Sequence, residues 1–132
     1  GEATVPKITI TLRKSYGGSH IVMGCKQLRA DLNFAWPSSE IAVMGASGAV
    51  AVLCGKEAKA KKEAGEDVKA FLAEKEQEYT DKFANPYQAA QYGYIDDVIE
   101  PRNTRFRICR GLAQLATKRQ SLPAKKHGCM PM

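Results

Sequence analysis

The fold is decided by VPKITITLRKSYGGS, at residues 5–19. The first half of this stretch alternates isoleucine or leucine with threonine, and this period of two predicts a strand over residues 5–12. Residues 13–19 form a predicted loop with two adjacent glycines, and a helix is expected over residues 20–28. A strand, a glycine-containing loop and a helix in this order are typical of an α/β protein.

The same order of elements recurs along the rest of the chain. Further strands are predicted at residues 31–36, 40–44 and 94–99. Helices are predicted at residues 49–62, 66–83 and 87–92, and a last helix begins at Thr104, its expected N-cap. There is no internal sequence repeat and no low-complexity linker, so the chain is expected to form one unit.

Composition excludes several classes of protein. Hydrophobic residues make up 44% of the 132 residues and charged residues 26%, as in ordinary globular proteins, which excludes a disordered tail, a collagen-like fibre and a membrane-embedded bundle. No stretch approaches the 18 continuous apolar residues of a membrane-spanning helix, and no signal peptide is visible. Because the chain begins at Gly1 rather than at a methionine, we expect either that a leader was removed or that the chain is the end of a longer polypeptide.

The positive charge is concentrated at the C-terminal end. Residues 101–132 hold eight Lys or Arg and no acidic residue, although the formal charge of the whole chain is only +6. Only Phe106 is interleaved with these charges, whereas a nucleic-acid surface needs several stacking side chains. A solvated or subunit-facing segment is therefore the preferred interpretation.

The four cysteines are predicted to be reduced. They lie scattered along the chain without a C-x-x-C pair, and the first three lie in apolar or helical stretches where cysteine behaves as a small buried hydrophobe. Reduced thiols favour a reducing compartment. The cysteines are Cys25, Cys54, Cys109 and Cys129.

The glycine pair is the strongest local candidate for chemistry. Glycines between a strand and a helix let backbone N–H groups approach a ligand without obstruction by a side chain. Two such donors suit an oxyanion, either a phosphate or the negative oxygen of an enolate. The spacing of a P-loop or a dinucleotide-binding motif is absent, and a tight turn without a ligand is the alternative.

Other candidates are weaker. His20 is either a catalytic group or an ordinary residue at the start of a helix, and His127 with Cys129 lacks the further ligands of a metal site. Asp96 and Asp97 are neighbours in a predicted strand, so their side chains point to opposite faces and are expected to be solvated or salt-bridged. Trp36 is expected to pack at the end of a predicted strand.

The chain as a whole resembles the C-terminal part of a biotin-dependent acyl-CoA carboxyltransferase β subunit, of the propionyl-CoA or acetyl-CoA carboxylase or methylmalonyl-CoA transcarboxylase type. The resemblance runs nearly from end to end through several motifs in the same order. These are VPKIT at 5–9, RKSYGGS at 13–19, AWPSSEIAVMGA at 35–46, KFANPY at 82–87, IDDVIEP at 95–101, TR at 104–105, ATKR at 116–119 and PAKKHG at 123–128.

The resemblance implies an α/β fold of the crotonase-like (ClpP/crotonase) type, a superhelix of β-β-α units. Residues 1–132 would be the C-terminal portion of the second carboxyltransferase domain. Such enzymes move a carboxyl group between carboxybiotin and the α-carbon of a short acyl-CoA, propionyl-CoA or acetyl-CoA. By position, the backbone amides of Gly18 and Ser19 would form the oxyanion hole for biotin, and Gly17, His20 and Ile21 would bind substrate.

The resemblance also implies partners. Biotin would be carried by a partner carrier domain, and no metal is expected. The other expected partners are an acyl-CoA substrate, a biotin carboxylase subunit, the missing N-terminal half of the same subunit, and further copies in a hexamer. Neither nucleic acid nor direct membrane insertion is expected, and the location would be the cytoplasm, or the mitochondrial matrix in a eukaryote, within fatty acid metabolism.

Two positions depart from the family pattern. Ile21 stands where members that prefer propionyl-CoA often carry Asp, and His20 stands where an aromatic residue is common. Two alternatives to a carboxylase also remain at this point. One is the carboxyltransferase subunit of a sodium-pumping methylmalonyl-CoA-type decarboxylase, and the other is a non-catalytic oligomerisation fragment.

Overall fold

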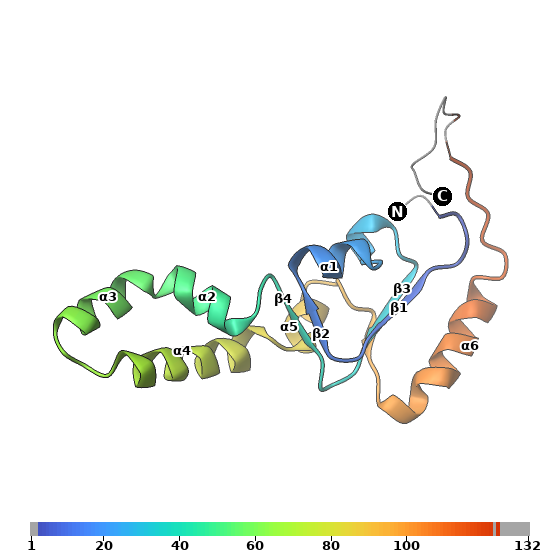
Figure 1. Cartoon of the computed structure of the whole chain (residues 1–132). Helices are drawn as coiled ribbons and strands as arrows, with labels where there is room; N and C mark the ends of the chain where they lie inside the picture. The colour runs from blue at the N-terminus through green and yellow to red at the C-terminus, as the bar shows by residue number, and fades with distance from the viewer. Residues whose placement is uncertain (1–2, 123, 125–132) are drawn as a thin grey trace.

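The computed structural model describes residues 3–122 and residue 124 of the chain. The molecule is elongated, with two regions that differ in construction (Figure 1). The body contains all the strands together with helices α1, α5 and α6, and the arm, residues 46–83, contains helices α2, α3 and α4. The arm projects from one end of the body, and α6 lies at the other end (Figure 1).

Three parallel strands form the main sheet of the body in the order β1-β3-β5. β1 (Ile8–Thr11) pairs with β3 (Leu32–Ala35), and β3 pairs in turn with the short β5 (Asp97–Val98). The strand predicted over residues 5–12 is thus shorter, and that predicted over 94–99 is reduced to two residues. The alternation also ends early, because Thr11 is buried while Leu12 is exposed.

A second, two-stranded parallel sheet repeats this arrangement. β2 (Lys14–Tyr16) pairs with β4 (Glu40–Ala42), so the expected loop over residues 13–19 contains a strand. The chain therefore runs through β1-β2-α1 and then β3-β4-α2, with each strand of the first unit paired in parallel with the corresponding strand of the second. Stacked β-β-α units of this kind form the predicted superhelix.

The first helix begins earlier than predicted. α1 covers Gly17–Val22, so the glycine pair forms its first turn and does not precede it, and Lys26–Leu28 is a separate 3-10 helix, η1. Gly24 separates the two with φ +110°, a conformation that favours glycine. The single helix predicted over residues 20–28 is therefore wrong in its start and in its continuity.

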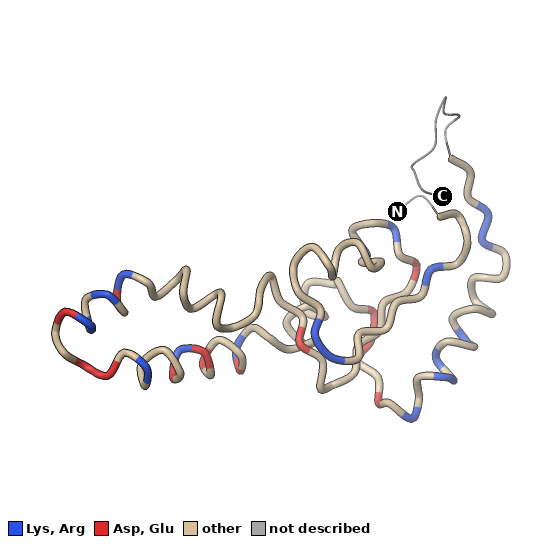
Figure 2. Tube along the Cα trace, viewed as in Figure 1, with Lys and Arg blue, Asp and Glu red and all other residues tan. Residues whose placement is uncertain are grey.

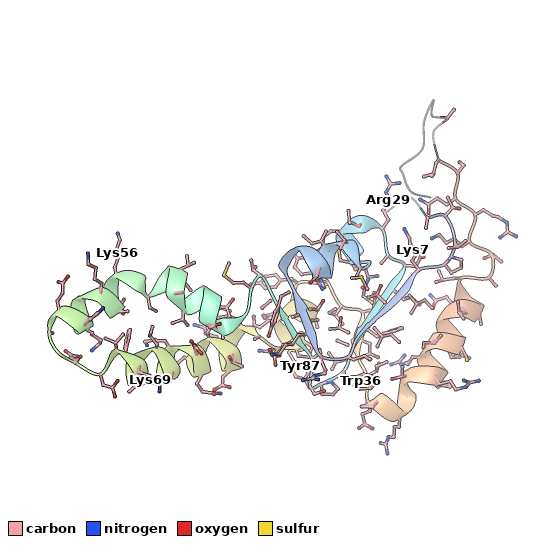
Figure 3. The ribbon with its side chains drawn as sticks, in the orientation of Figure 1. Lys7, Arg29, Trp36, Lys56, Lys69 and Tyr87 are labelled. Carbon is pink, nitrogen blue, oxygen red and sulfur yellow. The ribbon has the colours of Figure 1, made fainter. Side chains whose placement is uncertain are left out.

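The arm is a helical hairpin. α2 (Ala46–Leu53) and α3 (Gly55–Glu63) are separated at Cys54, whereas one helix was predicted over residues 49–62. α4 (Val68–Phe83) returns beside them and agrees with the prediction of 66–83 within two residues. The Asp67 carboxylate caps α4 by accepting hydrogen bonds from the Lys69 and Ala70 amides at 3.0 and 3.1 Å. Lys56 and Lys69 lie on the outer sides of this hairpin (Figure 3).

The core lies in the body, where α5 (Pro86–Gln91) packs against the strands. The Asn85 side chain caps α5 and Pro86 stands in its first turn, as expected for a helix start. The buried apolar cluster draws on both sheets, on α5 and on the segment that follows it. Its members are Ala35, Ile41, Ala89 and Ile95.

α6 (Thr104–Gln114) packs on the main sheet after a short 3-10 helix, η2 (Pro101–Asn103). Gly111 is buried there, and a Cβ atom at this position would lie 2.8 Å from Leu32 Cδ1 and 2.9 Å from Ile8 Cδ1. Trp36, beside the start of α6 (Figure 3), donates its indole N–H to Thr104 Oγ1 at 2.9 Å. The absence of a side chain at Gly111 thus lets the helix approach the two strands closely.

Two predictions about α6 are wrong. Thr104 is inside the helix and binds Trp36, and the N-cap position falls on Asn103 without a side-chain cap. Cys109 is exposed, whereas Cys25 is buried and Cys54 is half-buried. These three cysteines are free, and Cys129 lies outside the described residues. The positive charge of α6 is plain in Figure 2, where arginines occur along the helix without Asp or Glu.

Candidate functional site

Gly17 fixes the turn from β2 into α1. Its φ is +51°, and a Cβ atom would lie 2.8 Å from the backbone carbonyl oxygen of Val43, just after β4. Side chains disfavour this φ, and the carbonyl leaves no space for one. Glycine is therefore required here by both conformation and close contact, and the turn presents the next two residues to the surface.

Gly18 and Ser19 each present a free backbone N–H group. No group in the described part of the chain accepts a hydrogen bond from either amide, since both belong to the first turn of α1. A Cβ atom on Gly18 would meet nothing within 4 Å, and the Ser19 hydroxyl is turned back to donate to the Tyr16 carbonyl at 2.6 Å. Two adjacent donors therefore face open space.

These donors act as individual hydrogen-bonding groups. α1 has only six residues, whereas about ten were expected, so its dipole adds little to the attraction of an anion. The electrostatic value of the site rests on the two N–H groups themselves, which suit one oxygen that carries negative charge.

A cavity of about 590 Å³ adjoins the same turn and is mostly apolar. Three of the predicted site residues, Gly17, His20 and Ile21, line it, while Gly18 and Ser19 are exposed beside them and are not in its wall. The other lining residues come from η1, from β4 and the residue after it, from α2 and α4 of the arm, and from α5 and the segment that follows it. They are Gln27, Ile41, Ala42, Val43, Leu53, Tyr79, Phe83, Gln88, Ala89, Tyr92 and Tyr94.

His20 is held in this wall by a neighbour on β2. Its Nδ1 lies 2.9 Å from Ser15 Oγ, and burial lowers the pKa of His20 below its ordinary value of 6.5. The imidazole is therefore neutral at pH 7. Since no described carboxylate contacts the ring, the site lacks the His–carboxylate pair of a general-base catalyst.

Tyr16 and Glu40 form a structural pair next to the turn. The Tyr16 hydroxyl donates to the Glu40 carboxylate, and burial together with this carboxylate raises the pKa of Tyr16 to about 12. Tyr16 thus remains a neutral hydrogen-bond donor at physiological pH. The pair links β2 to β4, the two strands that carry the turn.

Sequence reasoning missed the aromatic wall of the cavity. Tyr79 and Phe83 fit the apolar stripe of α4, which indicated a helix face for packing, but nothing in the pattern shows that α4 faces α1. Tyr92 and Tyr94 stand around a turn after α5, with their rings 6.2 Å apart. The density of tyrosines from 79 to 94 is the one signal that could have pointed to this wall.

The weaker candidates do not gather into a site. Asp96 binds Lys26 at 2.7 Å, whereas Asp97 binds Arg107, which confirms that the two carboxylates belong to separate ion pairs. Among residues 3–122 and 124, no three His, Cys, Asp or Glu side chains group as a metal site would require. His127 and Cys129 lie outside the described residues. None of the described helices is both long and apolar enough to cross a membrane.

Comparison with known proteins decides the family. Residues 1–130 match the family described as the carboxyl transferase domain. The chain belongs to this family. It is 53% identical over 131 residues to the propionyl-CoA carboxylase beta chain of Saccharopolyspora erythraea and 51% identical over 131 residues to the methylmalonyl-CoA decarboxylase subunit alpha of Propionigenium modestum. Each alignment covers 99% of this chain, but only 24% and 25% of those relatives.

The structural comparison agrees. This chain superimposes on the structure of transcarboxylase 12S with a TM-score of 0.86 and 54% sequence identity. The superposition covers 99% of this chain and 24% of the 12S chain. That 12S structure is a hexamer with methylmalonyl-coenzyme A and methylmalonic acid bound. The predicted family and the crotonase-like fold are confirmed. The chain spans about a quarter of the length of these relatives.

Proposed function

We propose that this chain is the C-terminal portion of the second domain of a carboxyltransferase subunit, and that it forms the biotin-facing side of the active site. The complete enzyme would move a carboxyl group between carboxybiotin and the α-carbon of a short acyl-CoA, propionyl-CoA or acetyl-CoA. Carboxybiotin, on a partner carrier domain, would supply the carboxyl group. The Gly18 and Ser19 amides would donate to the ureido oxygen of biotin, where negative charge develops during transfer.

The pair of unpartnered amides carries this proposal. A ureido oxygen accepts two hydrogen bonds, and the open space over Gly18 leaves room for the rest of the ring. The adjoining apolar cavity, with Gly17, His20 and Ile21 in its wall, suits the uncharged body of such a ligand. The residues present therefore fit biotin.

Carboxylases and decarboxylases of this family differ in the acyl-CoA that they use and in the source of the carboxyl group. A carboxylase beta chain and a decarboxylase alpha subunit share 53% and 51% identity with this chain, so overall similarity does not separate them. Ile21 contributes an apolar side chain to the cavity, which favours an acyl group without charge near this position. A biotin carboxylase gene beside this one would favour the carboxylase, and a membrane decarboxylase gene would favour the sodium-pumping alternative.

The test compares two substitutions at Gly18 in the complete subunit. Gly18→Pro removes the N–H donor and is expected to lower kcat for transfer by about 100-fold or more, as loss of one oxyanion donor does in other enzymes. Gly18→Ala keeps the donor, and its methyl group meets no protein atom within 4 Å, but it narrows the space left for the biotin ring. It is therefore expected to raise KM for biotin and to lower kcat much less than Gly18→Pro does. Near-normal transfer by Gly18→Pro, with assembly intact, would move the oxyanion role elsewhere.

A second measurement addresses the non-catalytic alternative. The isolated 132-residue chain is expected to show no transfer between free carboxybiotin and an acyl-CoA, because the thioester site would lie in the remaining part of the subunit. Turnover by the isolated chain would contradict this division of the active site. Activity restored on mixing with the remaining part by the wild-type chain, but not by its Gly18→Pro variant, would exclude a purely oligomerising role.

A further inference from the structure

His20 is the one cavity-lining side chain among the described residues that is both ionisable near neutral pH and held by a hydrogen bond. Ser15 Oγ lies 2.9 Å from its Nδ1, and Ser15 itself lies in the middle of β2, paired with Ile41 of β4. The ring orientation is therefore set by the sheet. Within the described residues, Nε2 of His20 has no hydrogen-bond partner.

The Ser15 contact indicates which nitrogen carries the proton. Ser15 Oγ has no other hydrogen-bond partner among the described residues, so its O–H is satisfied only if it donates to Nδ1. The opposite arrangement would leave the Ser15 hydroxyl proton without an acceptor among the described residues. In a neutral imidazole the proton then resides on Nε2, which makes Nε2 a donor.

We propose that His20 is a ligand-contacting residue of the carboxyltransferase site, where its Nε2–H donates to the ureido oxygen of biotin, and that Ser15 is its positioning residue. This inference rests on the proposed function. His20 lines the cavity that adjoins the turn with the two free amides. The ligand would thus receive a third N–H donor, which comes from the cavity wall and not from the backbone.

The surroundings keep this donor uncharged. Apart from His20, the titratable side chains in the cavity wall are Tyr79, Tyr92 and Tyr94. The Glu40 carboxylate on nearby β4 already accepts from Tyr16. No described acidic side chain pairs with the ring. A neutral donor orients an oxygen without the desolvation cost of a buried cation.

The test uses the complete subunit and measures carboxyl transfer from a carboxylated acyl-CoA to free biotin, with each substrate varied in turn. His20→Phe keeps an aromatic ring but removes the donor, and it is expected to raise KM for biotin about five- to tenfold, the loss of one hydrogen bond of about 1–1.4 kcal/mol. KM for the acyl-CoA should stay within twofold. His20→Gln keeps an N–H donor and should bring KM for biotin back to within about threefold of the wild-type value.

Ser15 provides an independent variant. Ser15→Ala is expected to raise KM for biotin about threefold, whereas Ser15→Thr should leave it unchanged. The double variant Ser15→Ala, His20→Phe should have the same KM for biotin as His20→Phe alone, because Ser15 acts through His20. An unchanged KM for biotin in His20→Phe, or equal losses in His20→Phe and His20→Gln, would overturn the inference while the wild type remains active. A wild-type subunit without transfer activity would overturn the proposed function and this inference with it.

Discussion

The body and the arm reach their structures by different means. In the body, strands 24 or more residues apart pair in parallel around a buried cluster that includes Ala35 and Ile95. In the arm, α2 buries only Ala49 and Val50, α3 and α4 have no buried residue, and Val52 and Leu53 are 74% and 68% exposed. Local contacts add to the stability of the arm, such as the Asp67 cap and the Lys75–Glu78 ion pair.

This difference shows which region is stabilised mainly by its own buried core. The body buries its own core, whereas the arm presents apolar side chains to its surroundings and depends on helix-forming signals within its own sequence. Substitutions of the same chemical kind, made once in each region, therefore separate long-range packing from local stabilisation.

The largest expected difference comes from removing an apolar side chain. Ile95→Ala in the body core, where Ile95 is 4% exposed, should lower the free energy of unfolding by about 2–5 kcal/mol. Val52→Ala in the arm should change it by less than about 0.5 kcal/mol. Urea unfolding of the chain, followed by circular dichroism, measures both values. Equal losses would show that the arm side chain is as well packed as the core.

Two glycines with positive φ provide the next comparison. Gly17 in the body has φ +51° and would place a Cβ atom 2.8 Å from a backbone oxygen, whereas Gly65 in the arm has φ +78° with nothing within 4 Å. Gly65→Ala should cost about 1–2 kcal/mol for the backbone conformation alone, and Gly17→Ala should cost about 1–2 kcal/mol more because of the contact with Val43. Equal costs in urea unfolding would mean that the contact relaxes freely.

The arm and the body also differ in how far the sequence predicts them. α4 was located within two residues because the preceding Gly65, its apolar stripe and the following Asn85-Pro86 are all local signals. β2 was missed because a three-residue strand has no period of its own and exists only through its pairing with β4. The break between α2 and α3 at Cys54 was also missed, because no clear sequence pattern marks it.

The site follows the same division. Adjacent glycines are a local signal and pointed to backbone donors at this turn, whereas Gly18 and Ser19 themselves were assigned by the family resemblance. Within the described residues, neither amide has a hydrogen-bond partner. The Ser15–His20 bond and the tyrosine wall arise from tertiary packing between α1, β2, α4 and α5, which a single sequence does not reveal. The assignment of the amides to biotin remains a prediction.

Helical glycines should give effects of opposite sign in the two regions. Gly111→Ala places a Cβ atom 2.8 and 2.9 Å from Leu32 and Ile8, so overpacking of about 1–3 kcal/mol should outweigh the gain in helix propensity. Gly48→Ala in α2 meets only the Met44 sulfur at an ordinary 3.7 Å and should stabilise the chain by about 0.5–1 kcal/mol. Thermal unfolding resolves the sign, and stabilisation by both substitutions would show that α6 is loosely packed.

The smallest expected effect concerns ion pairs. In the body, Lys118 binds Asp31 at 2.8 Å with both side chains mostly buried, and it also donates to the Val5 carbonyl. In the arm, Lys75 and Glu78 are paired at the same distance on an exposed face. Lys118→Met should therefore lower the free energy of unfolding by about 1 kcal/mol at neutral pH, whereas Lys75→Met should leave it unchanged.

The pH dependence of this effect identifies its source. Burial alone would raise the pKa of Asp31, but the hydrogen bonds from Lys118 and from the Lys7 amide outweigh it and hold the pKa below its ordinary value of 3.8. A carboxyl group with a lowered pKa in the folded state contributes stability that is complete above 3.8 and is lost as the pH falls through the folded-state value. The difference between wild type and Lys118→Met should thus be constant from pH 5 to 7 and shrink below pH 4. A difference that persists at the lowest pH at which the chain folds would instead assign the effect to the packing of the Lys118 stem and its bond to Val5.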